Sequence, residues 1–102
     1  FLGNRMAPEN NVYAIDLSSA ARKALKKINK PDVIKIVEKL KILATSRTTL
    51  DIKKLEKHKN LYRLRCGNYR IVYEPLHHEI VIYVVLIGSR ATVYKDLEKL
   101  LK

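Results

Sequence analysis

LYRLRCGNYRIVY, the sequence of residues 61–73, holds three arginines and three tyrosines on two short runs that meet at Gly67-Asn68. Apolar and polar residues alternate along each run, which is the pattern of a strand with one buried face. A Gly-Asn pair between two such runs predicts a tight turn, so the stretch predicts a β-hairpin. Arg63 and Arg65 leave the same face of the first strand, and Arg65 and Arg70 flank the turn.

The predicted hairpin brings like charges together. Arg65 and Arg70 approach each other across the strand pair, and like charges that close repel by up to roughly 1 kcal/mol. A bound anion removes this repulsion, and the planar fork of arginine donors suits phosphate. A second basic-aromatic pair, Arg90 and Tyr94, follows a long apolar run. These residues predict a small RNA-directed protein; separately solvated arginines, with Glu74 as a local partner, are the alternative.

The first half of the chain predicts two helices. A weakly alternating run predicts a first strand over 12–16, and a helix capped by Ser18 or Ser19 follows it. Residues 29–31, Asn-Lys-Pro, break this helix, and a continuous apolar stripe predicts a second helix over 32–44. We expect the two helices to form an antiparallel αα-hairpin.

The second half predicts a polar segment over 45–60, the hairpin, a turn over 75–79 and a further strand. Residues 80–87 are apolar on both faces, which predicts a central strand that ends at Gly88. Thr92 caps a last helix whose apolar stripe comprises Val93, Leu97, Leu100 and Leu101. The order β-α-α-β-β-β-α predicts an α+β fold, a small antiparallel sheet with the helices on one face.

Composition points to an anionic partner for a single domain over 12–102. Lys and Arg number 21 against 10 Asp and Glu, which gives a formal net charge of +11. So large a charge favours a polyanionic or acidic partner, and nucleic acid, the ribosome and an acidic protein all stay open; a well-solvated surface is the alternative. The only methionine is Met6, which we expect to be the natural first residue, with residues 1–5 of artificial origin. Residues 1–11 show no pattern of a helix or strand and are expected to be an extension that is partly artificial or disordered. Cys66 is the only cysteine, no signal peptide is visible and no stretch has the length of a membrane helix, which together predict a cytoplasmic protein.

Other chemistries find little support in the sequence. No His, Cys, Asp and Glu set has metal-ligand spacing and no glycine-rich phosphate loop is present, so no cofactor is implied. His77 and His78 are predicted to be exposed turn residues, because adjacent extended residues point apart. His58 is predicted to be solvated, with RNA contact as the alternative. Buried roles are predicted for Cys66, Tyr62, Tyr69 and Tyr73.

These residues also resemble a known family. The pattern Tyr62-x-Leu64-Arg65-x-Gly67-x-Tyr69-Arg70-Ile71-Val72-Tyr73, followed by an apolar strand and Gly88-x-Arg90-x-x-Val93-Tyr94, is similar to that of the RelE/ParE superfamily of bacterial and archaeal toxins. Lys54-Leu55 upstream fits the same pattern. The resemblance covers about residues 12–101, nearly the whole chain.

The resemblance implies a function. RelE-type toxins are ribosome-dependent endoribonucleases that cut mRNA in the A site, where the ribose 2′-OH attacks the adjacent phosphate without a metal ion. By similarity the catalytic positions are Arg65, Arg70, Arg90 and Tyr94, and Arg63 holds a flanking phosphate. The lysine-rich segment is expected to add RNA contacts through Lys53, Lys54, Lys57 and Lys59.

One departure concerns the general base. The best-known RelE enzymes have lysines where this chain has Arg63 and Arg65. Arginine does not release its proton in proteins, so neither residue serves as the base. Tyr94, a group on the ribosome, or no dedicated base are the options that follow.

The resemblance leaves two other functions open and implies a partner. ParE-type members share the fold but inhibit DNA gyrase and cut no RNA, and a toxin-derived RNA-binding protein without activity is a third hypothesis. Both toxin types are held inactive by a cognate antitoxin. We therefore expect an acidic, RelB-like antitoxin, in a complex compatible with a heterotetramer, besides the ribosome and mRNA.

Overall fold

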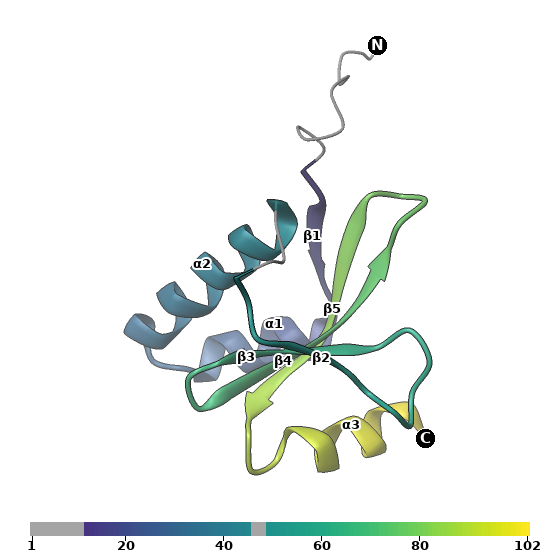
Figure 1. The fold of residues 1–102 in the computed structure, drawn as a ribbon. Helices are drawn as coiled ribbons and strands as arrows, with labels where there is room; N and C mark the ends of the chain where they lie inside the picture. The colour runs from purple at the N-terminus through teal and green to yellow at the C-terminus, as the bar shows by residue number, and fades with distance from the viewer. Residues whose placement is uncertain (1–11, 46–48) are drawn as a thin grey trace.

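The computed structural model describes residues 12–45 and 49–102, so Met6 and Arg47 lie outside the described residues. Within these described ranges, five strands and three helices follow one another as β1 (Ala14–Leu17), α1 (Ser19–Lys27), α2 (Lys30–Thr45), β2 (Ile52–Lys54), β3 (Tyr62–Cys66), β4 (Tyr69–Leu76), β5 (Val81–Ser89) and α3 (Val93–Leu101). The strands form one sheet in the order β1-β5-β4-β3-β2 (Figure 1). The predicted α+β class is therefore confirmed.

Local side-chain bonds explain where the first two helices begin. The Ser18 hydroxyl accepts a hydrogen bond from the backbone N–H of Ala21 at 3.0 Å, which makes Ser18 the cap of α1. The Asn29 side-chain oxygen accepts from the backbone N–H of Asp32 at 3.0 Å in the same way. Because Asn29 offers this bond, α2 starts at Lys30, two residues before the expected boundary, and Pro31 falls in its first turn.

The predicted hairpin is present, and its turn has a clear geometry. Cys66 pairs with Tyr69, which leaves a two-residue loop, and Arg65 lies directly opposite Arg70. Gly67 has φ of 59°, whereas Asn68 is not among the positive-φ residues. A positive φ at the first loop position alone is the pattern of a type II′ turn, which takes glycine there. This explains why the pair reads Gly-Asn rather than Asn-Gly.

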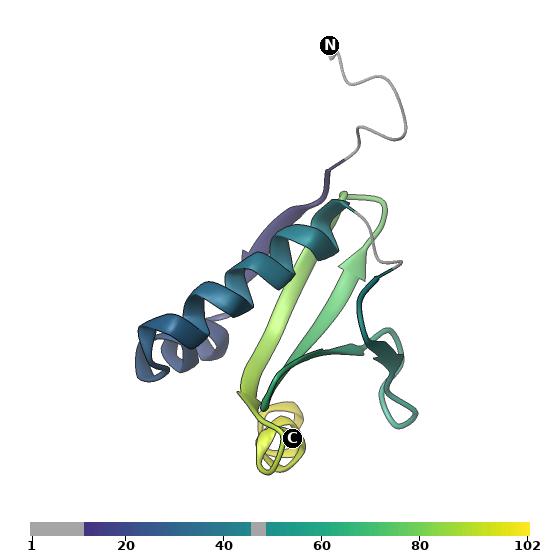
Figure 2. The same ribbon diagram turned by 60° about the vertical axis from the view of Figure 1, so that its left-hand side comes forward.

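The sheet differs from the expected one in three respects. β1 pairs with β5 in parallel, so the sheet is mixed, because α1 and α2 lie between the two halves of the chain and lead back across the sheet. Residues 52–54 were expected to lie in a polar segment without a strand, but they form β2 and pair with β3. Three residues are too few to show the two-residue alternation of a strand in the sequence. α3 packs on the face of the sheet opposite α1 and α2, so the helices do not share a face (Figure 2).

The end of β4 also differs from its prediction. A turn was expected over 75–79, but β4 continues through Leu76 and Pro75 pairs with Ile82. The register shifts between Val72 and Tyr73, which marks a bulge in β4. The next strand, β5, ends at Ser89, one residue beyond the expected stop at Gly88.

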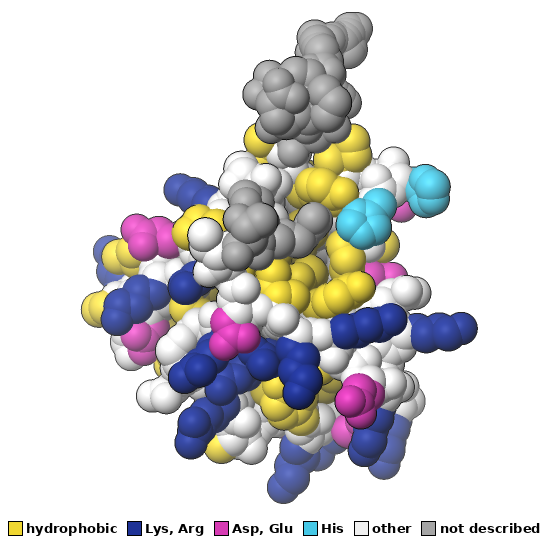
Figure 3. All heavy atoms as spheres, viewed as in Figure 1, with side chains coloured by type: hydrophobic (Ala, Val, Ile, Leu, Met, Phe, Trp, Pro, Cys, Tyr) yellow, Lys and Arg dark blue, Asp and Glu magenta, His cyan; other side chains and the backbone are white. Residues whose placement is uncertain are grey.

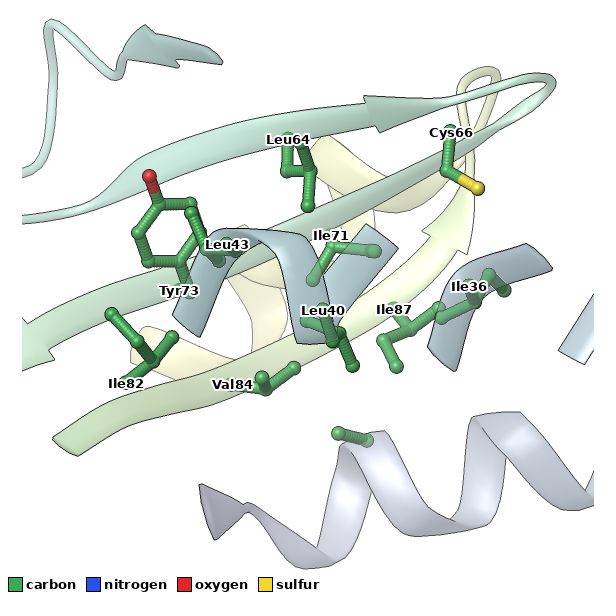
Figure 4. Packing of buried hydrophobic residues seen from close by; sticks show 11 residues of the cluster. Ile36, Leu40, Leu43, Leu64, Cys66, Ile71, Tyr73, Ile82, Val84 and Ile87 are labelled. Carbon is green, nitrogen blue, oxygen red and sulfur yellow. The ribbon is translucent and has the colours of Figure 1, made fainter. Parts of the chain in front are cut away.

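Two apolar clusters lie on the two faces of the sheet. The larger cluster packs α1 and α2 on the strands (Figure 4) and contains Ala21, Ile36, Leu40, Leu43, Leu64, Cys66, Ile71, Tyr73, Ile82, Val84 and Ile87. The smaller cluster packs α3 on the other face and contains Leu61, Val72, Val85, Leu86, Val93 and Leu97. β5 contributes to both clusters and lies between β1 and β4, which confirms the predicted central strand. This packing fixes α3 beside the face that carries the arginines.

Candidate nucleic-acid interface

Strand register places basic residues in facing pairs on β2, β3 and β4. Lys53 lies directly opposite Arg63, and Arg65 lies directly opposite Arg70. Directly opposite residues of an antiparallel pair share a face of the sheet. The face therefore carries two like-charged pairs side by side, an arrangement that an anion stabilises.

An open groove of about 990 Å³ runs between this face and α3. Its walls come from residues 53–58, from β3 and β4, from the connection after β5 and from α3, and its lining comprises Lys53, Lys54, Leu55, Glu56, Lys57, His58, Arg63, Arg70, Arg90, Ala91, Tyr94, Lys95, Leu97 and Glu98. Figure 3 shows Lys and Arg side chains gathered in the lower half of this side of the molecule. The groove is thus basic and reachable from solvent.

Most of the residues that the sequence singled out line this groove, and two do not. The lining includes Arg63, Arg70, Arg90, Tyr94, Lys53, Lys54 and Lys57. Arg65 and Lys59 are exposed but are absent from the lining. Arg65 lies next to the groove, since it pairs with Arg70 across the hairpin.

Hydrogen bonds to backbone carbonyl oxygens tie Arg70 and Arg90 to the hairpin turn. Arg70 Nη1 donates to the carbonyl oxygen of Gly67 at 2.9 Å and to that of Tyr69 at 3.1 Å. The backbone N–H of Arg90 donates to the carbonyl oxygen of Asn68 at 2.8 Å. The turn therefore anchors Arg70 through its side chain and Arg90 through its backbone, which brings residues 20 positions apart in sequence to one end of the groove.

Close packing explains how the chain turns from β5 into α3. A Cβ added at Gly88 would lie 3.3 Å from Val93 Cβ, so glycine allows the start of α3 to approach the end of β5. The hydroxyls of Ser89 and Thr92 are 2.9 Å apart and bridge the turn. Val93 is buried and Tyr94, its neighbour, is 41% exposed on the groove side of α3.

Two residues near the groove were not foreseen in these roles. The Asp51 carboxylate pairs with Arg63 at 3.1 Å and lies 3.7 Å from Arg65. His58 Nε2 is 3.2 Å from Glu98 Oε2, and the pair joins the β2–β3 connection to α3 across the groove. Asp51 and Arg63 are 12 residues apart in the sequence, and His58 and Glu98 are 40 residues apart. Neither contact therefore leaves a local sequence signal.

The remaining candidate groups lie elsewhere. The Tyr13 hydroxyl is 2.7 Å from His77 Nδ1, so His77 ties the β4–β5 turn to the start of β1, and both His77 and His78 are exposed. Cys66 is buried, and burial raises the pKa of its thiol above the ordinary value of 9.0. That shift disfavours the thiolate, so Cys66 is a core residue here rather than a nucleophile. Burial and the carboxylate of Asp32 likewise raise the pKa of Tyr69.

Within residues 12–45 and 49–102, no three His, Cys, Asp or Glu residues come together in a group that could hold a metal ion. In the same ranges no helix is both long and apolar enough to cross a membrane.

The groove is suited to a phosphodiester backbone. Arginine stays charged at any pH at which proteins fold and offers several donors in one plane. Three such groups around one groove, with a tyrosine ring beside them, supply phosphate contacts and a stacking surface. The α+β fold, with basic residues beside its last helix, is the fold that the resemblance to the RelE/ParE toxins implies.

The comparison with known proteins agrees. The model of the family described as ParE toxin of type II toxin-antitoxin system, parDE, matches residues 15–94. The chain belongs to the RelE/ParE superfamily of toxins. No curated protein sequence matches it.

Several solved structures of similar fold are RelE toxins, alone or in complex with RelB. The archaeal RelE–RelB complex from Pyrococcus horikoshii has 28% identity and a TM-score of 0.67, over 78% of this chain and 96% of that chain. The RelB–RelE complex from Methanococcus jannaschii has 26% identity and a TM-score of 0.64, over 79% and 96%. A double mutant of Escherichia coli RelE in the free state has 25% identity and a TM-score of 0.69, over 89% and 99%.

Proposed function

We propose that this protein is an endoribonuclease that cuts ribosome-bound mRNA in the A site and so inhibits translation. The observation that carries the proposal is the groove that holds Arg63, Arg70, Arg90 and Tyr94 together. These side chains come from β3, β4, the connection after β5 and α3. The similarity to RelE proteins from three organisms supports the RelE-type reaction.

Charge stabilisation is the part of the reaction that this groove supplies. As the ribose 2′-OH attacks the adjacent phosphate, negative charge grows on the oxygens bound to phosphorus. Arg70 and Arg90 stabilise this charge, and fixed donors of this kind are often the largest single catalytic contribution. Arg63, with Arg65 beside the groove, holds the flanking phosphates. The products are a 2′,3′-cyclic phosphate and a 5′-OH.

Proton transfer is the part for which the groove offers fewer groups. The three groove arginines do not accept or release a proton at neutral pH. Tyr94 lies exposed in the groove, where its ring stacks on a base or its hydroxyl moves a proton. A group on the ribosome and a reaction without a dedicated base are the other two options.

Primer extension on an mRNA incubated with the protein, with and without translating ribosomes, tests the proposal. Cuts that appear only with ribosomes, at fixed positions within codons, are the expected result. An mRNA left intact in both reactions contradicts it. Equal cutting of naked mRNA shows a ribonuclease that does not need the ribosome.

One observation favours a second candidate function, the inhibition of DNA gyrase. The family model that matches residues 15–94 describes ParE toxins rather than RelE toxins. A supercoiling assay with purified gyrase separates the two functions. Loss of supercoiling at protein concentrations that leave ribosome-bound mRNA intact favours the ParE-type function. RNA binding without either effect points to an inactive RNA-binding protein.

The proposal includes an acidic, RelB-like antitoxin as the partner. The similar structures include complexes of a RelE toxin with its RelB antitoxin from two archaea and Escherichia coli. In this protein the net charge of +11 suits an acidic partner, and Leu100 and Leu101 of α3 are 44% and 49% exposed. Co-expression with the gene encoded next to this one should relieve growth arrest, and unrelieved arrest contradicts this part of the proposal.

A further inference from the structure

The edge of the sheet next to the groove holds one carboxylate among several cations. Lys53 lies opposite Arg63 and Arg65 lies opposite Arg70, so like charges face each other twice. Asp51 immediately precedes β2 and is the only acidic residue in 51–54 and 62–66, the strands that carry Lys53, Arg63 and Arg65. Its position is fixed by the sheet, because its backbone carbonyl accepts the backbone N–H of Arg65 at 3.0 Å.

The two oxygens of this carboxylate contact two different arginines. Arg63 Nη1 donates to Asp51 Oδ1 at 3.1 Å and also lies 3.4 Å from the Asp51 carbonyl oxygen. Arg65 Nη1 lies 3.7 Å from Asp51 Oδ2. Asp51 therefore holds Arg63 at two points and Arg65 more loosely at one.

The two arginines differ in how far they reach into solvent. The side chain of Arg63 is 17% exposed and lines the groove, whereas that of Arg65 is 55% exposed and does not. Both contacts to Asp51 use the single nitrogen Nη1 of Arg63. A guanidinium has five N–H donors, so the contacts orient Arg63 and leave donors for a phosphate in the groove.

We propose that Asp51 is a positioning residue: its carboxylate fixes the guanidinium of Arg63 in the groove wall, in the orientation that meets RNA phosphate. This inference rests on the proposed ribonuclease function and adds a residue that acts through Arg63 rather than on the RNA. An acidic group beside a polyanion site weakens binding through repulsion, so its benefit lies in the rate of cleavage. Asp51 thus lowers the affinity for RNA but aligns Arg63 for cleavage.

The substitution Asp51→Asn separates alignment from charge. Asparagine keeps the size of the side chain and one oxygen acceptor but loses the ion pairs with both arginines. Glu79→Gln is the matched control, because it removes one negative charge from an exposed position in the β4–β5 turn, outside the groove lining. Asp51→Glu restores the charge on a longer arm.

The test is single-turnover cleavage of mRNA on programmed ribosomes, with the protein concentration varied to give a maximal rate and a half-saturating concentration. For Asp51→Asn the maximal rate should fall roughly tenfold, while the half-saturating concentration stays the same or falls. Asp51→Glu should recover part of the rate, and Glu79→Gln should match the wild type. A maximal rate of Asp51→Asn within about twofold of the wild type, or a raised half-saturating concentration alone, overturns the inference.

A measurement on the unmodified protein covers the case in which Asp51→Asn does not fold. The side-chain N–H signals of Arg63 in a ¹⁵N NMR spectrum should be separately resolved, as expected for a guanidinium whose rotation is restricted. One averaged signal like that of a free arginine overturns the inference. A wild type that cuts no mRNA contradicts the proposed function, whereas a wild type that cuts no faster than Asp51→Asn contradicts the role of Asp51 alone.

Discussion

Among single residues, Arg70 and Arg90 reach the groove by different means. The guanidinium of Arg70 donates to two carbonyl oxygens of the hairpin turn, so replacing it also removes turn contacts. Arg90 is anchored by its backbone N–H, which any residue except proline retains, and its side chain is exposed. An effect of Arg90→Ala on activity is therefore the cleaner measure of a guanidinium in the groove.

Tyr94→Phe separates the two roles open to Tyr94. The ring is retained, so stacking on a base persists, and only the hydroxyl is lost. If the hydroxyl transfers a proton, the maximal cleavage rate should fall by about 10²-fold or more with little change in RNA affinity. A rate equal to that of the wild type contradicts proton transfer by Tyr94 and leaves stacking as its role. Tyr94→Ala is the companion variant, which loses both.

The buried thiol of Cys66 predicts a dependence on pH. Its pKa is raised in the folded protein, chiefly by burial, so above about pH 9.0 the unfolded chain releases this proton while the folded chain keeps it. The contribution of this group to stability is therefore fully present below pH 9.0 and declines above it. Alkylation of Cys66 at pH 8 should be much slower in the native protein than in urea, and Cys66→Ala should abolish labelling. Equal labelling rates would show an accessible thiolate.

The alternation of apolar and polar residues predicted which side chains share a face of a strand. It did not predict which distant side chains form ion pairs. The alternation in 61–66 placed Arg63 and Arg65 on one face, and their structure agrees because a strand has a period of two. Asp51 and His58 could not be assigned partners, since ion pairs between distant segments leave no local pattern. Whether the predicted catalytic residues act in catalysis stays a prediction.

At the scale of elements, the β3–β4 hairpin sets the spacing of the groove cations. Gly67 has φ of 59°, in the region that side chains disfavour, and nothing lies within 4 Å of an added Cβ. Gly67→Ala should therefore destabilise through the backbone alone, by about 1 kcal/mol, which lowers Tm by roughly 4–8 °C in a domain of this size. Thermal unfolding checks this. Asn68→Ala is the matched control and should leave Tm within a few degrees; a Gly67→Ala Tm equal to that of the wild type contradicts the turn assignment.

Long periodic elements were predictable, and pairings between distant ones were not. Apolar stripes indicated α1, α2 and α3, and an apolar run indicated β5. The parallel pairing of β1 with β5 depends on how the helices cross the sheet, which no local pattern encodes. β2 has only three residues and forms because β3 offers an edge. The position of α3 on the second face follows from the apolar residues that β4 and β5 present there, such as Val72 and Leu86.

At the scale of the whole molecule, the net charge of +11 predicts salt-dependent binding. If five lysine or arginine side chains of the groove contact the phosphates of a single-stranded RNA, a plot of the logarithm of the binding constant against the logarithm of the salt concentration should have a slope of about −3.5. Arg63→Gln should flatten the slope by about 0.7. Fluorescence anisotropy with a labelled oligonucleotide at several salt concentrations gives both values. A slope near zero contradicts phosphate contact as the basis of RNA binding.

If the arginines of the groove catalyse the cleavage of mRNA on the ribosome, as we claim, removing one of them should slow that cleavage under single-turnover conditions. Wild type, Arg90→Ala and Arg22→Ala are compared on the same programmed ribosomes. Arg22 is an exposed arginine of α1 outside the groove lining, so its variant carries the same change of charge. We expect Arg90→Ala to lose about 10²-fold or more in rate and Arg22→Ala to match the wild type. A wild type without cleavage, or an Arg90→Ala rate equal to that of Arg22→Ala, contradicts the claim.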